Sequence, residues 1–176
     1  GMICMEICSP ELCTGCGMCT NICPHGAIKM VSGFHGFVFP EVDNTKCINC
    51  GLCASRCPAA NEKKSGNTMA KIFAAWNKQE KIRRSSTSGG VFSLACDSIL
   101  KDNGMVAGVQ WDDNFCPRHI ITDDEEAIKT FKGSKYVQSN TGEIYFDVKK
   151  ALNQGRKVLF SGTPCQVAAL KAYLGK

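Results

Sequence analysis

Two short cysteine-rich segments have the residue types and spacing to hold metal centres. The first is CTGCGMCTNICP (13–24) and the second is CINCGLCASRCP (47–58). Both follow C-x2-C-x2-C-x3-C-P, so the pattern is an internal repeat. A cubane iron–sulfur cluster needs four thiolates, and three cysteines at this spacing can wrap one cluster within a short loop. Zinc sites also use C-x2-C half-sites, but two identical copies of the full run favour [4Fe–4S] clusters.

Residues 12–60 resemble a bacterial two-cluster ferredoxin domain. In such domains the fourth cysteine of each run, before proline, ligates the other cluster. The resemblance therefore implies one cluster on Cys13, Cys16, Cys19 and Cys57, and a second on Cys47, Cys50, Cys53 and Cys23. Between the runs, alternating apolar residues around two glycines predict a small hairpin.

The composition of the chain argues against several other classes of protein. The chain has 176 residues and thirteen cysteines, and an odd count with tight C-x2-C spacing argues against a disulfide scaffold. Such cysteines are typical of a reducing compartment, so we expect a cytoplasmic protein with no secretory signal and no membrane span. Two clusters would lower the formal net charge from +5 to about +1. Because the basic residues are also scattered, we expect no nucleic-acid partner.

The pattern changes after residue 60. Residues 61–70 are mostly small and polar and predict a linker. Beyond them strands and helices alternate, which is typical of an α/β domain. Strands are expected at 71–76, 105–111, 118–122 and 157–160, and helices at 89–101, 123–131, 142–153 and 164–174. We therefore predict an α+β ferredoxin-like two-cluster domain at 1–60, followed by an α/β domain at 71–176.

Two turns of the predicted α/β domain have residues that suit the binding of an anion. SSTSGG (85–90) leads into a helix with hydroxyls and flexible backbone amides. FSGTPCQ (160–166) follows a strand and places Pro164 at the first helical position. For each turn, a phosphate site and an ordinary helix cap are both open interpretations. Cys165 lies at the helix N-terminus, where a thiolate is favoured, and is a redox thiol, a ligand or a small buried residue.

The remaining cysteines and the histidines follow no ligand spacing. Cys96 lies within an apolar helix and is expected to pack in the core. The three histidines are expected to be core or surface residues. No role is assigned to Cys4, Cys8 and Cys116.

Three stretches downstream of the ferredoxin segment carry a second resemblance. They are STSGGVFSLA, FKGSKYVQS and VLFSGTPCQVAALKAYL. Together with the cysteine runs, over residues 6–175, they resemble the beta subunits of the deazaflavin-reducing (coenzyme F-420-type) hydrogenases and dehydrogenases. The resemblance implies a flavin, FAD, that exchanges electrons with the clusters. The residues that it places near the flavin are Ser88, Gly89, Gly90, Gly133, Ser134, Lys135, Tyr136, Thr163, Pro164, Cys165 and Gln166.

The resemblance gives two of these residues catalytic roles. The Lys135 cation would stabilise reduced, anionic flavin, with a solvated loop lysine as the alternative. Cys165 would lie at the cofactor or ligate a further cluster whose other ligands lie beyond residue 176. Members of the family are longer, and the chain ends where another α/β segment should begin. We therefore expect an incomplete α/β domain and an incomplete flavin site.

Two functions of different classes follow from these residues. The first is an iron–sulfur flavoprotein oxidoreductase, or its N-terminal portion, that passes electrons between two [4Fe–4S] clusters and a flavin. Its redox partner would be a protein, a reduced deazaflavin or a ferredoxin. The alternative is a non-catalytic ferredoxin-type carrier with an α/β docking module, and flavin binding separates the two. A regulatory iron–sulfur sensor is disfavoured, because all eight ligand positions are cysteine. The substrate, and whether the chain alone is an enzyme, stay open.

Overall fold

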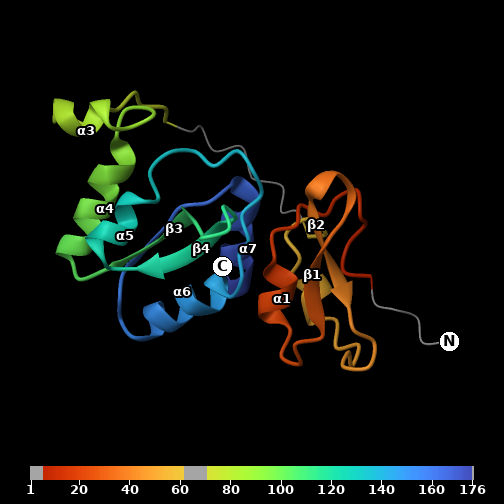
Figure 1. Ribbon diagram of the computed structural model, residues 1–176. Coiled ribbons are helices and arrows are strands. Elements are labelled where there is room, and N and C mark those ends of the chain that lie inside the picture. Colours follow the sequence, from red (N-terminus) through yellow and green to blue (C-terminus); the bar gives the residue numbers. More distant parts are fainter. Residues whose placement is uncertain (1–5, 62–70, 176) are drawn as a thin grey trace. The chain divides into compact units, whose positions relative to one another are not determined.

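The computed structural model describes residues 6–61 and 71–175, which divide into two compact units (Figure 1). The first unit comprises residues 6–61, 140–149 and 162–175, and the second comprises 71–139 and 150–161. The domain limits proposed from the sequence stay a prediction. The predicted linker, 61–70, lies outside the described residues apart from its first position.

The first unit is built around a β-hairpin and short helices. Strands β1 (Ile28–Ser32) and β2 (Val38–Val42) pair antiparallel around the turn η1 (Phe34–Gly36), so the predicted hairpin is confirmed. Helix α1 (Met18–Ile22) packs on β1, on α2 (Leu52–Ser55) and on α7 (Pro164–Leu174).

The two cysteine runs have the same local backbone. The residues that precede α1 and α2 are Gly17 and Gly51, with φ values of 73° and 72°. This left-handed conformation strains any residue with a Cβ, which explains why both runs place glycine directly after their second cysteine.

The second unit contains a three-stranded sheet in the order β4-β3-β5. Strand β3 (Met105–Trp111) pairs antiparallel with β4 (Pro117–Thr122) and parallel with β5 (Val158–Phe160). Helix α4 (Val91–Lys101) packs on β3 and β5. Helix α5 (Glu125–Lys129) follows β4, and α6 (Ile144–Asn153) begins in the first unit and ends in the second. The described part of the chain is thus a mixed α/β fold with small sheets.

Apolar side chains of α4, β3 and the α5 region form the core of the second unit. Its buried members are Cys96, Val106, Ile128 and Phe131. Gly108 of β3 lies beneath the Phe131 ring, and a Cβ there would approach Phe131 Cγ to 2.8 Å. The position of Cys96 confirms its expected role as a core residue.

The secondary structure confirms most of the expected elements. Helices at 91–101, 125–129, 144–153 and 164–174 and strands at 105–111 and 117–122 lie where the periodicity places them. The strand expected at 71–76 is wrong. That segment has no strand pairing, and Ile72 and Phe73 are 93% and 79% exposed, so its apolar residues do not face a core. A short helix, α3 (Glu80–Arg84), follows it instead. Strand β5 forms, but its side chains are only half-buried.

His119 is a core histidine of the second unit, in agreement with its expected structural role. Its ring is 7% exposed and stacks on Phe160 with 5.6 Å between ring centroids. Nε2 lies 3.3 Å from the Ser161 carbonyl oxygen, and Nδ1 lies 3.1 Å from Ser139 Oγ. Burial lowers the pKa of this histidine, so the neutral ring is favoured in the folded state.

Among the described residues, we find no helix with the length and apolar character needed to cross a lipid bilayer.

Candidate iron–sulfur centres

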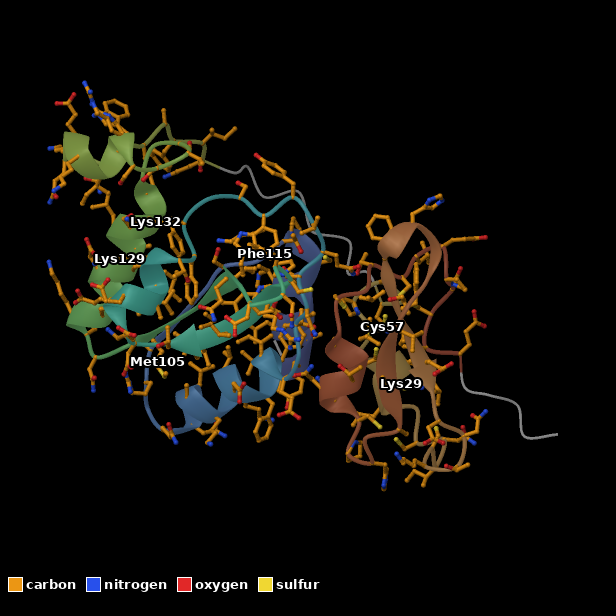
Figure 2. The ribbon with its side chains drawn as sticks, in the orientation of Figure 1. Lys29, Cys57, Met105, Phe115, Lys129 and Lys132 are labelled. Carbon is orange, nitrogen blue, oxygen red and sulfur yellow. The ribbon has the colours of Figure 1, made fainter. Side chains whose placement is uncertain are left out.

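Two open cavities of the first unit are lined by cysteines. One has about 340 Å³ of empty space, and the other has about 400 Å³. The cysteines of the first cavity are Cys8, Cys13, Cys16, Cys19 and Cys57. Those of the second cavity are Cys23, Cys47, Cys50 and Cys53. Figure 2 shows Cys57 in the first unit, close to the hairpin that carries Lys29.

Each cavity combines three cysteines of one run with the last cysteine of the other. Cys57 follows the end of α2 in sequence but lines the cavity of the first run, together with Met30 and Pro40 of the hairpin. Cys23 follows α1 and lines the cavity of the second run. This crossed arrangement is the one that the ferredoxin resemblance implies for the ligands. The ligation itself stays a prediction.

Most residues in the lining of one cavity have a counterpart in the lining of the other. Thirty-four positions separate Cys13 from Cys47, and the same offset relates Gly17 to Gly51 and Met18 to Leu52. The internal repeat in the sequence is therefore also a repeat of structure. Both cavities can be expected to take the same kind of group.

Electrostatics within the first cavity reflect thiols held close together. Burial, together with the charges of the neighbouring Cys16 and Cys13, raises the pKa of Cys19 to about 12. Burial also raises the pKa of Cys16, with a smaller contribution from Cys57. A bound metal ion would reverse this balance, because coordination stabilises the thiolate.

The second cavity shows the same effect. Burial raises the pKa of Cys53, and the charges of Cys23 and Cys50 add to the rise. Cys23 is thus an electrostatic neighbour of the second run, although it belongs in sequence to the first.

The donors of each cavity, three cysteines of one run and the last cysteine of the other, are those that a [4Fe–4S] cluster takes. Within residues 6–61 and 71–175, no three histidine, cysteine or acidic side chains converge as ligands of one metal ion. A cubane distributes its four thiolates over four iron atoms, so its ligand sulfurs lie farther apart than the ligands of one ion. The chemistry of the donors therefore fits a [4Fe–4S] cluster.

A distant segment of the chain holds the loop of the first run. The buried Tyr145 hydroxyl donates a 2.6 Å hydrogen bond to the Cys16 carbonyl oxygen, across 129 residues of sequence. Asn21 Nδ2 donates to the Gly142 carbonyl oxygen at 2.7 Å. Thr141 packs against Gly17 so closely that a Cβ at Gly17 would collide with its hydroxyl. Sequence reasoning missed this segment, because neither the cysteine pattern nor helical periodicity marks these contacts.

The flavin residues predicted at the SSTSGG turn lie between α3 and α4 in the second unit. Ser88 is exposed, Gly89 is half-buried and Gly90 is buried with φ 73°. A Cβ at Gly89 would approach the Ala75 carbonyl oxygen to 2.6 Å, so this glycine is also needed for packing. The hydroxyls of Ser85 and Ser86 both donate to the Ile82 carbonyl oxygen, which makes that part of the turn a helix cap.

Asn77 is a polar residue beside this turn that sequence reasoning missed. It is 1% exposed, its backbone amide donates to the Gly89 carbonyl oxygen, and its Oδ1 accepts from the Gln79 amide. Its Nδ2 has no hydrogen-bond partner within the described residues. A buried amide donor without a partner is costly, so it marks a place where a ligand acceptor would be stabilised.

The segment 133–136 lies in the second unit after α5. Gly133 and Ser134 are exposed, Gly133 has φ 83°, and Tyr136 is 94% exposed. Lys135 is half-buried, and its ammonium donates to the carbonyl oxygens of Thr130 at 2.8 Å and Lys132 at 3.2 Å. Desolvation lowers the pKa of Lys135.

The remaining predicted flavin residues, Thr163, Pro164, Cys165 and Gln166, lie in the first unit at the start of α7. Gln166 is buried, and its Oε1 accepts the Thr163 amide at 2.8 Å, so it caps this helix. Cys165 is half-buried, with its Sγ 3.0 Å from Thr163 Oγ1. The charge of Cys165 raises the pKa of Cys16, so these two residues are near neighbours.

Comparison with known proteins assigns the two parts of the chain. Residues 12–61 match the 4Fe-4S dicluster domain. Residues 72–144 match the family described as coenzyme F420 hydrogenase/dehydrogenase, beta subunit N-term. A search of curated proteins found no match. The chain thus combines a segment that matches an iron–sulfur dicluster domain with a segment that matches the N-terminal part of this beta-subunit family, and the combination indicates an electron-transfer subunit of an oxidoreductase.

Proposed function

We propose that the first unit is a ferredoxin-like module that holds two [4Fe–4S] clusters by crossed ligation. The observation that carries this proposal is the lining of the two cavities, each of which receives its fourth cysteine from the other run. The first cluster is held by Cys13, Cys16, Cys19 and Cys57, and the second by Cys47, Cys50, Cys53 and Cys23.

The residues of the chain then have distinct tasks. Each bound cluster would supply one-electron redox chemistry. The cysteines hold it as thiolates, and the left-handed glycines Gly17 and Gly51 allow the loops to turn tightly after the second cysteine of each run. Tyr145 fixes the carbonyl of Cys16 and thereby the path of the first loop.

The finer proposal is that the second unit binds a flavin, FAD, at the SSTSGG turn. The unpartnered Nδ2 of Asn77 supports it, because it offers a buried donor directly beside Gly89 and Gly90. Lys135 donates to two carbonyl oxygens, which leaves its third N–H for an anionic group. The flavin would supply two-electron chemistry, and its exchange with the clusters would make the chain part of a flavin-dependent oxidoreductase.

Partner subunits belong to this proposal as well. The family description refers to a beta subunit, which implies an assembly with other chains. We place the working complex in the cytoplasm, since reduced thiolates are needed to hold the clusters.

The crossed ligation is tested by replacing Cys23 with alanine. We expect the second cluster to be lost or reduced to three irons, although the substitution lies in the first run. The first cluster should keep its four irons. Iron and sulfide are measured after anaerobic reconstitution. Electron paramagnetic resonance of the oxidised and reduced protein then shows the state of each cluster. Cys116→Ala, at an exposed cysteine, is the control and should keep both clusters. Loss of the first cluster instead of the second would overturn the crossed ligation.

The flavin proposal is tested by anaerobic titration with FAD, followed by quenching of flavin fluorescence. We expect one flavin per chain. In Asn77→Asp, which keeps the acceptor for Gln79 and removes the NH₂ group, affinity should fall about tenfold or more. Asn114→Asp, the same chemical change at an exposed position of the same unit, should bind as the unaltered chain does. A chain that holds both clusters but binds no flavin would leave the ferredoxin-type carrier as its function.

A further inference from the structure

The first cavity contains one cysteine more than a cluster needs. Cys8 lines it beside Cys13, Cys16, Cys19 and Cys57. In the second cavity the described residues include four cysteines and no fifth. Cys8 lies five positions before the cysteine run and is outside its C-x2-C spacing, so the motif alone does not include it.

The internal repeat shows that Cys8 is a departure from the common pattern. The thirty-four-residue offset that relates Cys13 to Cys47 relates Cys8 to Val42. Val42 lines the second cavity, so the two residues occupy corresponding places. One cavity therefore has a thiol where the other has an apolar side chain.

Local structure fixes the Cys8 thiol against two of the predicted ligands. Its thiol neighbours in the cavity are Cys57 and Cys13. Ile7 is buried next to it, at 7% exposure. The Cys13 amide donates to the Ser9 carbonyl oxygen at 3.1 Å, which ties the Cys8 segment to the start of the run.

We propose that Cys8 is an alternative ligand of the first cluster, which exchanges with Cys57. This inference rests on the proposed function, since it requires a cluster in the first cavity. In the exchange, the bond from iron to the Cys57 sulfur breaks and a bond from the same iron to the Cys8 sulfur forms. The proton released by the Cys8 thiol is taken up by the Cys57 thiolate, so neither the net charge nor the electron count changes. The first cluster can thus survive the loss of a ligand, and the second cannot.

The test compares matched variants of the two cavities in the full chain. Iron and sulfide are measured after anaerobic reconstitution, and the signal of a three-iron cluster is measured in the oxidised protein. The unaltered chain should hold about eight irons, from two four-iron clusters. Cys57→Ala and Cys8→Ala should each keep this content and show no three-iron signal. The double variant Cys8→Ala/Cys57→Ala should lose the first cluster or keep it with three irons. Cys23→Ala should do the same to the second cluster, and Cys23→Ala/Val42→Cys should recover its four irons.

The outcomes separate the inference from the function on which it rests. If the unaltered chain holds no clusters, the proposed function fails. If it holds two, but Cys57→Ala is as depleted as the double variant, the alternative ligand is wrong. If Cys57→Ala fails to fold, the variants of the second cavity test the proposal instead. Recovery of iron in Cys23→Ala/Val42→Cys supports exchange at this place in the repeat, and its absence overturns it.

Discussion

Replacing Gly17 with alanine is expected to lower the free energy of unfolding by about 2–5 kcal/mol and to disturb the first cluster selectively. Two costs combine. The φ of 73° strains a residue with a Cβ by about 1–2 kcal/mol. The new methyl group would also collide with the Thr141 hydroxyl, and overpacking of this kind costs about 1–3 kcal/mol. The loop must move to relieve the collision, and it carries Cys16 with it.

Gly26→Ala is the matched control for this experiment. Gly26 belongs to the same unit and also has a left-handed backbone, with φ 57°, but a Cβ there would meet no atom within 4 Å. Only the backbone cost should remain, and both clusters should stay intact. Chemical unfolding under anaerobic conditions gives the free energies, and iron analysis gives the cluster content. Equal losses in the two variants would show that the contact with Thr141 does not hold the loop.

Replacing Phe131 with alanine is expected to destabilise the second unit by about 3–5 kcal/mol. The ring is 8% exposed and packs with Cys96, Val106 and Ile128 in the core. It also covers Gly108, where no side chain could take its place without repacking. The cavity left by the ring would therefore remain largely unfilled.

Phe115 provides the control for this core substitution. It is labelled in Figure 2, lies in the β3–β4 turn and is 84% exposed, with φ 55°. Phe115→Ala should change the free energy of unfolding by no more than about 0.5 kcal/mol. Thermal and denaturant unfolding of both variants measure the difference. Similar losses at the two positions would mean that Phe131 does not contribute the core contacts assigned to it.

Features of the structure that depend on a local sequence pattern could be predicted from the sequence. The x2 and x3 spacing marks the cysteine runs, and Pro164 marks the start of α7 at the residue where it begins. The strand predicted at 71–76 was wrong because an apolar segment forms a strand only where a neighbouring strand pairs with it. Its exposed Ile72 and Phe73 have no such neighbour in the described structure.

The contacts that complete the candidate sites were beyond prediction from local pattern. Tyr145 is one of several apolar residues on an amphipathic helix, and nothing in its position along α6 indicates a bond to Cys16. Asn77 resembles any polar residue of a loop until its burial and its unpartnered Nδ2 are known. Cys8 lies outside the motif spacing, and only the cavity shows that it joins the run.

The bond between Tyr145 and Cys16 also bears on how the protein is made. All eight predicted cluster cysteines leave the ribosome well before residues 140–149 and α7, which complete the first unit. Non-local contacts of this kind form late, because the intervening chain must first be ordered. The nascent cysteine runs therefore remain without their final support until residues 140–149 and α7 have left the ribosome. Cluster insertion is then best timed after this segment has emerged, when it can pack against the loaded loop.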